Sequence, residues 1–466
     1  MNRKKCQFDC RKCKKCTLFV SDIHNTNVKK QSCTLPSDFI PDHHTSLTYG
    51  IAFDLGTSTV AGSLWNLQSG TLIASASLPN YQCKYGSDVI SRIMFCREAP
   101  DHLNKLQSLL IDCMNDIIQE ICARNDISSQ NITKVTLAGN STISHLVLGI
   151  DPAPLAQVPF APVFLEAQEM RARDLGIQTD PSAAVFLLPN IAGHVGSDIV
   201  SMMLATRFDT LKGNHIGIDI GTNGEVLAIK DGHILTCSAA AGPAFEGASI
   251  YHGMRASAGA IKKVEYKNYD IKINTIENQP PVGICGSGLI DAIACLLKCG
   301  IIDKNGRMLS QEEALDAHLP QTLVRRLTVH ENAPAFTLAY NASNNTILLT
   351  QKDIREVQLA KGAIFAGIQT LMKALDMRPE ELDSILIAGA FGSHIEKDNA
   401  LKIGLLPLIP AETIILVGNA AGTGASMALL SDKERIRASE IAKKVHHVEL
   451  STSMDFQEFY IKSMQF

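Results

Sequence analysis

The stretch that decides the fold occurs twice, as Gly50-Ile-Ala-Phe-Asp54-Leu-Gly56-Thr57-Ser58-Thr59 and as Gly217-Ile-Asp219-Ile-Gly221-Thr222-Asn223-Gly224-Glu225. Each copy runs from apolar residues through an acid, an apolar residue, glycine and threonine into a second apolar run, at residues 60–65 and 226–229. This order predicts one β-hairpin that is built twice. A single Asp-x-Gly-Thr turn is common in ordinary hairpins, so the prediction of a functional site rests on the pairing of the two copies.

The two turns are the candidate site for a nucleotide. Glycine lets the backbone approach an anion, and peptide N–H groups and hydroxyl groups can then hold phosphate oxygens. We expect Asp54 and Asp219 at the positions that hold Mg2+ or its water shell. Glu225 is the candidate for polarising the attacking water, and a charged residue that merely begins a strand is the alternative interpretation. The expected phosphate-binding residues are Gly56, Thr57, Ser58, Thr59, Gly221, Thr222, Asn223 and Gly224.

The rest of each half also repeats. Residues 103–121 and 359–375 have the apolar spacing of a helix, and each is followed by a short apolar strand, at 134–137 and 384–387. The sequence therefore predicts an α/β fold of two units, each made of a hairpin, a helix, a strand and a helix, which face one another.

This arrangement resembles the nucleotide-binding superfamily of acetate and sugar kinases, heat-shock chaperones and actin, which have duplicated, ribonuclease H-like ATPase lobes. The resemblance implies that residues 387–392 form the adenosine loop and that residues 418–425 begin the second connecting helix. The nucleotide-binding residues implied in this way are Gly389, Ala390, Phe391, Gly392 and Gly422.

The remaining segments define the expected domain organisation. Residues 17–47 have little periodicity and are interpreted as a flexible tether. Near the end of the chain, the pattern predicts a short helix at 438–444 and a strand at 447–452. The expected division is a Cys-rich iron-sulfur arm at 1–35, a linker at 36–47, an actin-like lobe I at 48–205, an actin-like lobe II at 206–435, and a tail at 436–466 that packs on the core.

The composition favours a globular protein of the cytoplasm. The chain has 466 residues, 45% of them hydrophobic, and a net charge of -4, which argues against general nucleic-acid binding. No apolar run reaches the roughly 18 residues needed to span a bilayer. The first residues are basic, whereas a signal segment would contain an apolar stretch. We therefore expect a cytoplasmic protein with no nucleic-acid or membrane partner.

Four cysteines near the start form a candidate metal site. Cys6, Cys10, Cys13 and Cys16 have the spacing C-x3-C-x2-C-x2-C, which is too tight for a set of well-formed disulfides. We interpret them as ligands of an iron-sulfur cluster, with 4Fe-4S as the favoured type, while a zinc site and a metal-free tail remain alternatives. The neighbouring lysine and arginine residues would stabilise an anionic cluster. The first three cysteines also have the radical-SAM spacing, but no barrel pattern follows them.

Two other residues attract notice. Cys285 lies just before an apolar helix and is either a redox residue or, in the interpretation that we favour, a small residue at a close helix start. The sole tryptophan, Trp65, is expected in the core.

Four further segments resemble one branch of the superfamily. They are residues 85–93, 138–145, 189–198 and 284–291, which look like segments of the reductive activators of corrinoid proteins. The resemblance implies an ATP-hydrolysing reductive activase. Such a protein returns a Co(II) corrinoid protein of a methyltransferase system to Co(I), with an electron that a low-potential donor supplies through an iron-sulfur cluster. Relatives described in this way carry a larger ferredoxin-like domain at the N-terminus, or clusters at the C-terminus, where this chain has its short arm.

Other functions share parts of the pattern. A 2-hydroxyacyl-CoA dehydratase activator has the same fold and ATP-driven electron transfer, but it holds its cluster through cysteines inside the core. A small-molecule kinase would keep both phosphate turns and would have no use for a four-cysteine arm. A chaperone or filament protein would keep the nucleotide core without a redox role for the arm. The oligomeric state stays open, with a homodimer as one alternative.

Overall fold

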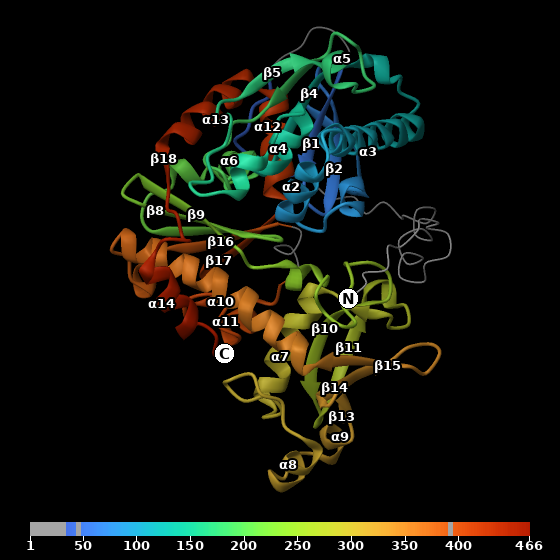
Figure 1. Cartoon of the computed structure of the whole chain (residues 1–466), viewed down its shortest axis with the longest axis vertical. Helices are drawn as coiled ribbons and strands as arrows, with labels where there is room; N and C mark the ends of the chain where they lie inside the picture. Colours follow the sequence, from blue (N-terminus) through green and yellow to red (C-terminus); the bar gives the residue numbers. More distant parts are fainter. Residues whose placement is uncertain (1–33, 43–47, 390–394) are drawn as a thin grey trace.

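The computed structural model describes residues 34–42, 48–389 and 395–466 of the chain. Figure 1 shows lobe I at the top, in blue and teal, above a lobe II whose large sheet lies across the middle of the molecule. Below that sheet, lobe II extends downward through smaller sheets and helices. The two lobes contact each other in the region between the two large sheets. The candidate functional residues described below lie in that region.

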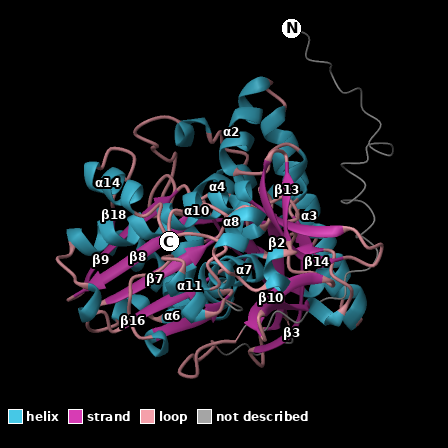
Figure 2. Cartoon of the chain, turned by 90° about the horizontal axis from the view of Figure 1, so that it is seen from below, coloured by secondary structure: helices cyan, strands magenta, loops and turns pink. Residues whose placement is uncertain are grey.

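Each lobe is built on a six-stranded sheet. In the order of the sheet, the strands of lobe I are β3 (Thr71–Pro79), β2 (Thr59–Asn66), β1 (Tyr49–Leu55), β4 (Ile132–Gly139), β6 (Ala184–Leu187) and β5 (Gln168–Arg171). Those of lobe II are β17 (Ile414–Gly418), β16 (Ser384–Ala388), β7 (His215–Ile220), β8 (Gly224–Lys230), β9 (His233–Ala239) and β18 (Val445–His447). Figure 2 shows β9, β8, β7 and β16 side by side from below.

The two sheets share one topology. In each sheet, three antiparallel strands in a meander continue into two parallel strands: β3-β2-β1 into β4-β6, and β9-β8-β7 into β16-β17. The register is shared as well, since Asp54 pairs with Ala138 and Asp219 pairs with Ala388 across the first parallel ladder. The prediction of a duplicated α/β unit is therefore confirmed.

Helices cover the sheets and link the lobes. The helices of lobe I are α2 (Val89–Glu98), α3 (His102–Asn125), α4 (Ser141–Leu148), α5 (Ala172–Leu175) and α6 (Ser197–Thr206). The later helices are α10 (Gln351–Ala374), α11 (Lys397–Lys402), α12 (Ala420–Leu430), α13 (Asp432–Lys444) and α14 (Met454–Lys462). The lower part of lobe II contains α7 (Gly286–Lys298), α8 (Gln311–Asp316) and α9 (Gln321–Val324), with strands β10 (Ala260–Lys267), β11 (Asp270–Thr275), β12 (Gly283–Ile284), β13 (Leu327–His330), β14 (Ala333–Tyr340) and β15 (Thr346–Thr350).

The long helices α3 and α10 have equivalent roles. Apolar residues of α3 such as Met114 and Ile117 are buried in one cluster with Phe53 of β1. Similarly, Ile364 of α10 shares a cluster with Val226 of β8. Both helices therefore bury an apolar face against the hairpin that carries the predicted phosphate turn, and burial of such side chains stabilises each lobe by roughly 1.5–3 kcal/mol per residue.

Two helices cross at the junction of the lobes. On α12, a Cβ built at Gly424 would lie 2.0 Å from the carbonyl oxygen of Ser201 on α6, so only glycine allows this close approach. The indole Nε1 of Trp65 donates a hydrogen bond of 3.1 Å to Ser426 Oγ on α12. Trp65 is 3% exposed, which confirms its expected place in the core.

The structure corrects two expectations about the ends of the chain. Residues 34–42 were expected within a flexible tether, but Leu35 and Phe39 pack against the cluster around Trp65. The tail helix begins at Asp432 and the strand that follows it is Val445–His447, so the predictions of a helix from 438 and a strand at 447–452 were wrong in their bounds. The strand is short because it pairs only with β9, at the edge of the sheet. The periodicity of apolar residues in the sequence does not reveal such a pairing.

Within the described ranges, every helix is too short or too polar to cross a lipid bilayer.

Candidate functional site

The two predicted phosphate turns converge on one carboxylate. Ser58, in the turn after β1, donates a hydrogen bond of 2.7 Å to Glu246 Oε2. Thr222, in the turn after β7, donates one of 3.1 Å to Glu246 Oε1. The guanidinium of Arg255 in lobe II also donates to the carbonyl oxygen of Ser58, at 2.9 Å. The turns of separate sheets are thus within reach of a single bridging group.

Asp54 is the next-to-last residue of β1 and contacts the residue that caps α12. Burial raises the pKa of Asp54 to about 6, and a hydrogen bond from the Asn419 side chain partly opposes this shift. Asn419 is the N-cap of α12, and its Oδ1 accepts a hydrogen bond of 2.7 Å from the backbone N–H of Gly422. The structure therefore brings the predicted residues Asp54 and Gly422 together through Asn419.

Asp219 lies against the start of the predicted adenosine loop. Burial raises the pKa of Asp219 to about 8, and the charges of Asp198 and Asp54 add to the shift. Gly389 has a φ of +91°, and a Cβ there would lie 2.6 Å from Asp219 Oδ1. The three residues after Gly389 that were implied for adenosine, Ala390, Phe391 and Gly392, lie outside the described residues.

A further carboxylate, Asp198, was not predicted as a site residue. It lies in the first turn of α6, and burial raises its pKa to about 7, with the charge of Asp54 adding to the effect. A Cβ at Gly196 would lie 2.4 Å from Asn140 Cα, so the start of α6 packs directly against the loop that follows β4. The signal in the sequence was the Gly-Ser-Asp run at 196–198, which begins a helix without an ordinary side-chain cap.

Glu225 is the most enclosed acid of the group. It is 7% exposed and pairs directly across the hairpin with Asp219. Burial and the charges of Asp198 and Asp219 raise the pKa of Glu225 well above its ordinary value, against a hydrogen bond of 3.4 Å from Ser238 Oγ. Like charges directly opposite one another on a hairpin are unfavourable, so this pair favours a bound proton or cation.

The donor set suits a divalent cation that binds partly through water. Carboxylate oxygens are the ligands that Mg2+ prefers, and Mg2+ usually keeps several waters while it binds one or two carboxylates and the phosphates of a substrate. Among the described residues, no three His, Cys, Asp or Glu side chains lie close enough together to enclose a metal ion by themselves. The charges of Asp54 and Asp198 raise the pKa of Asp219, so a cation bound together with a nucleotide would relieve the repulsion among these acids.

A buried arginine shapes the first turn. Arg92 of α2 is 0% exposed, and its guanidinium donates to the carbonyl oxygen of Thr57 and to Gln82 Oε1. Asn80 Nδ2 donates to the carbonyl oxygen of Gly56 at 2.9 Å. These bonds hold the carbonyl groups of Gly56 and Thr57 in the turn. Sequence reasoning did not single out Arg92 because a buried arginine cannot be distinguished from a surface one by pattern.

Five other predicted turn residues have identifiable surroundings. The Thr57 hydroxyl accepts a hydrogen bond of 3.0 Å from Asn140 Nδ2, so its own proton is available to another acceptor. A Cβ at Gly56 would lie 2.6 Å from the Thr59 carbonyl oxygen, and the Thr59 residue is exposed as the first residue of β2. In the second turn, Gly221 N–H donates to the carbonyl oxygen of Asn223 at 3.0 Å.

Five cysteines are singled out as candidates by the sequence. Cys6, Cys10, Cys13 and Cys16 lie outside the described residues. Cys285 is 3% exposed and its thiol donates to the carbonyl oxygen of Ile261 at 3.2 Å, as expected of a structural residue at a helix start.

Comparisons with known proteins match both lobes to the same family. Residues 49–211 match the family model described as the RACo middle region, and residues 214–466 match the model described as the C-terminal domain of RACo, the ASKHA domain. The chain is 38% identical over 434 residues to the corrinoid activation enzyme RamQ of Eubacterium limosum, which covers 92% of this chain and 72% of RamQ.

Two further relatives agree. A [Co(II) methylated amine-specific corrinoid protein] reductase of Methanosarcina barkeri is 26% identical over 465 residues, covering 90% of this chain and 77% of that protein. A solved structure of a reductive activator for corrinoid, iron-sulfur protein is 36% identical and superposes with a TM-score of 0.82, covering 91% of this chain and 67% of that one. These matches confirm the predicted actin-like fold class for the described residues.

Proposed function

The chain belongs to the family of reductive activators of corrinoid proteins, as its sequence predicted, and from this membership we propose that it reduces a corrinoid protein of a methyltransferase system from Co(II) to Co(I) at the expense of ATP. Each 59 mV of deficit in a one-electron transfer costs about 1.4 kcal/mol, or one tenfold factor in the equilibrium. ATP offsets such a deficit only if the two lobes have different arrangements with and without nucleotide.

One observation supports the nucleotide-driven step above all others. Ser58 and Thr222 belong to separate sheets and reach the same carboxylate of Glu246. A phosphate chain bound at that point would be held by both lobes at once, so binding and release of the nucleotide would change how the lobes sit together. We propose that the phosphates bind at both turns and that adenosine lies along Gly389 to Gly392 and Gly422.

The acids would serve the metal and the water. Asp54 and Asp219 are proposed to hold Mg2+ through direct or water-mediated contacts, and Mg2+ supplies charge neutralisation for the phosphates when bound. Glu225 remains the proposed group that polarises the attacking water. Asp198 is a second candidate for that role, because its pKa of about 7 lies near the working pH.

The electron would come from the N-terminal arm. We propose that Cys6, Cys10, Cys13 and Cys16 hold an iron-sulfur cluster of the 4Fe-4S type, which would supply one-electron transfer between a low-potential donor and the corrinoid protein. Residues 34–42 are fixed on lobe I through Leu35 and Phe39, so the arm starts from a defined point beside the connecting helix α12. Anaerobically purified protein should show the absorption spectrum of such a cluster and, after reduction with dithionite, its electron paramagnetic resonance signal, whereas a zinc site would show neither.

The decisive test mixes the protein, a low-potential donor and a Co(II) corrinoid protein. The Co(I) absorption band is followed with ATP, with a non-hydrolysable analogue and with neither. We expect a Co(I) yield that depends on hydrolysable ATP, and an ATPase rate that changes when the corrinoid protein is added. Equal yields in all three mixtures would contradict the proposal, and ATP consumption that needs a sugar or an acid as phosphoryl acceptor would indicate a kinase.

A chain without residues 1–33 is the matched control for the electron route. It keeps Leu35 and Phe39, which pack on lobe I, and therefore should keep nucleotide binding. It should lose reduction of the corrinoid protein. A shortened chain that reduces cobalt as well as the full chain does would rule out the cysteine arm as the carrier.

A further inference from the structure

Glu246 links the two lobes through the hydroxyl groups that are proposed for phosphate. Its two carboxylate oxygens accept from Ser58 Oγ at 2.7 Å and from Thr222 Oγ1 at 3.1 Å. Burial lowers the pKa of the Arg92 guanidinium, and the negative charge of Glu246 is one of the contributions that oppose this shift. The Glu246 side chain thus holds the negative charge that lies between the two turns in this structure.

The bonds of Glu246 exclude those of a nucleotide. A serine or threonine hydroxyl has one proton to donate. While Ser58 and Thr222 donate to Glu246, neither can donate to a phosphate oxygen. A carboxylate and a triphosphate at the same point would also repel each other, because both are negatively charged. Glu246 and the phosphates therefore compete for the same donors.

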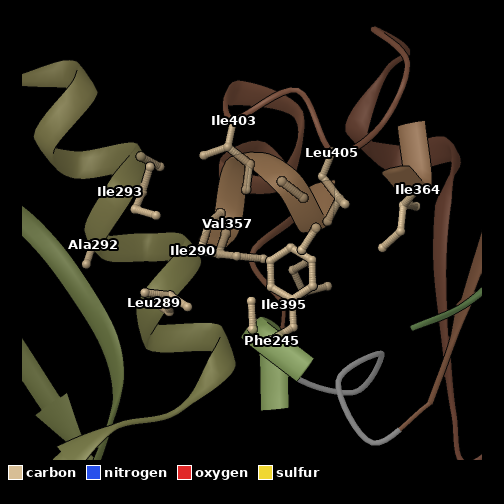
Figure 3. Packing of buried hydrophobic residues seen from close by; sticks show 14 of the residues in the cluster. Phe245, Leu289, Ile290, Ala292, Ile293, Val357, Ile364, Ile395, Ile403 and Leu405 are labelled. Carbon is tan, nitrogen blue, oxygen red and sulfur yellow. The ribbon is translucent and has the colours of Figure 1, made fainter. Parts of the chain in front are cut away.

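The local backbone holds Glu246 in place. It is the last residue of the short helix η5 (Pro243–Glu246), between Gly242 with a φ of 76° and Gly247 with a φ of 80°. Both glycines adopt left-handed conformations that other residues rarely take. The preceding residue, Phe245, is 3% exposed and packs in the lobe II core with Ile290, as Figure 3 shows. The side chain of Glu246 consequently extends to the turns from a rigid base, which suits a defined contact.

We propose that Glu246 is a latch between the lobes: in the nucleotide-free protein it occupies the hydroxyl groups of both turns, and the terminal phosphates of ATP displace it. The inference rests on the proposed nucleotide site at these turns. When phosphates replace the Glu246 carboxylate, the nucleotide connects the two lobes in place of a protein side chain. Loss of the phosphates after hydrolysis returns Ser58 and Thr222 to Glu246, which resets the protein.

The test compares the variants Glu246→Ala and Glu246→Gln with the full-length protein. Removal of the competing charge should lower the Kd for ATP about tenfold in Glu246→Ala, because the Ser58 and Thr222 hydroxyl groups can then donate to phosphate oxygens without displacing a carboxylate. Glu246→Gln removes the charge and keeps an acceptor, so a smaller decrease in Kd is expected. Without nucleotide, amide hydrogen exchange at the two turns should be faster in both variants.

Glu440→Ala is the matched control, because it removes one exposed glutamate from α13, remote from the turns. It should bind ATP like the wild type. Thermal unfolding of each variant shows whether the fold is retained.

The outcomes separate the latch from the nucleotide site. A wild-type protein that binds no ATP would overturn the proposed site, and the latch with it. Wild-type binding with an unchanged or higher Kd in both Glu246 variants would overturn the latch alone. An unchanged Kd combined with a large loss of hydrolysis would assign Glu246 to the chemical step and would also overturn the latch.

Discussion

Gly389 and Asp219 are in such close contact that any side chain on the glycine would displace the carboxylate. A Cβ at Gly389 would lie 2.6 Å from Asp219 Oδ1 and 2.7 Å from the carbonyl oxygen of Ile220. The first lobe repeats this contact, since a Cβ at Gly139 would lie 2.8 Å from the carbonyl oxygen of Leu55. In both lobes, the glycine at the end of β4 or directly after β16 fixes the position of the end of the adjacent hairpin strand. In lobe II, it also fixes the position of Asp219, an acid of the proposed site.

Gly389→Ala should impair the nucleotide site more than the fold. The added methyl group must push Asp219 aside, and misplacement of a catalytic group by 1 Å can cost on the order of 100-fold in rate. We expect at least a tenfold loss of ATPase activity, on the same principle. Gly232→Ala is the control: Gly232 also has a positive φ, of +81°, but nothing lies within 4 Å of its Cβ position. Equal losses in the two variants would show that backbone strain alone is responsible.

Asp219→Asn should separate activity from stability. The carboxylate is half-buried and lies near other acids, so its loss relieves repulsion and should raise the melting temperature of the metal-free protein at about pH 8. ATPase activity should fall on the order of 100-fold, because the proposed metal anchor is lost. Asp231→Asn, at an exposed position in the turn between β8 and β9, should change neither quantity. ATPase activity near the wild-type level would place the metal elsewhere.

The acids also predict how stability depends on pH. Folding raises the pKa of Asp54 to about 6, of Asp198 to about 7 and of Asp219 to about 8, so the folded state retains protons that the unfolded state releases above about pH 4. Stability without metal should therefore fall as pH rises from about 4 to about 8 and then level off.

Mg2+ should counter this loss of stability. It binds the ionised carboxylates, so the rise in melting temperature caused by Mg2+ with ADP should be larger at about pH 8 than at about pH 6. The measurement is thermal unfolding with Mg2+ or with sodium chloride of equal ionic strength. A rise of equal size at both pH values would mean that the metal does not bind these acids.

The sequence predicted the local parts of the site and missed its long-range contacts. The hairpins with Asp54 and Asp219 were identified because apolar runs on either side of an acid-x-Gly-Thr turn are local signals. Glu246 was not identified, since its partner Ser58 is 188 positions away and the residue lies in a short turn without a recognisable pattern. Asp198 was part of a quoted segment, but only the packing of α6 against β4 shows that it joins the other acids.

The crossing of α6 and α12 provides the last prediction. A Cβ at Gly424 would lie 2.0 Å from the Ser201 carbonyl oxygen, a backbone atom that cannot move without shifting α6 and with it Asp198. Gly424→Ala should therefore destabilise the protein by about 1–3 kcal/mol, the usual cost of overpacking, which corresponds to a decrease of several degrees in melting temperature.

Gly367→Ala is the matched control, because this glycine also lies inside a helix, α10, and its Cβ would meet Cys237 Sγ at an ordinary 3.4 Å. Alanine is favoured over glycine in a helix by about 1 kcal/mol, so the control should be neutral or more stable. If the two helices also transmit the effect of nucleotide between the lobes, Gly424→Ala should retain ATP binding at low temperature yet reduce less cobalt per ATP hydrolysed. A variant with wild-type stability and a wild-type ratio of cobalt reduced to ATP consumed would show that the close contact between α6 and α12 has no part in either folding or coupling.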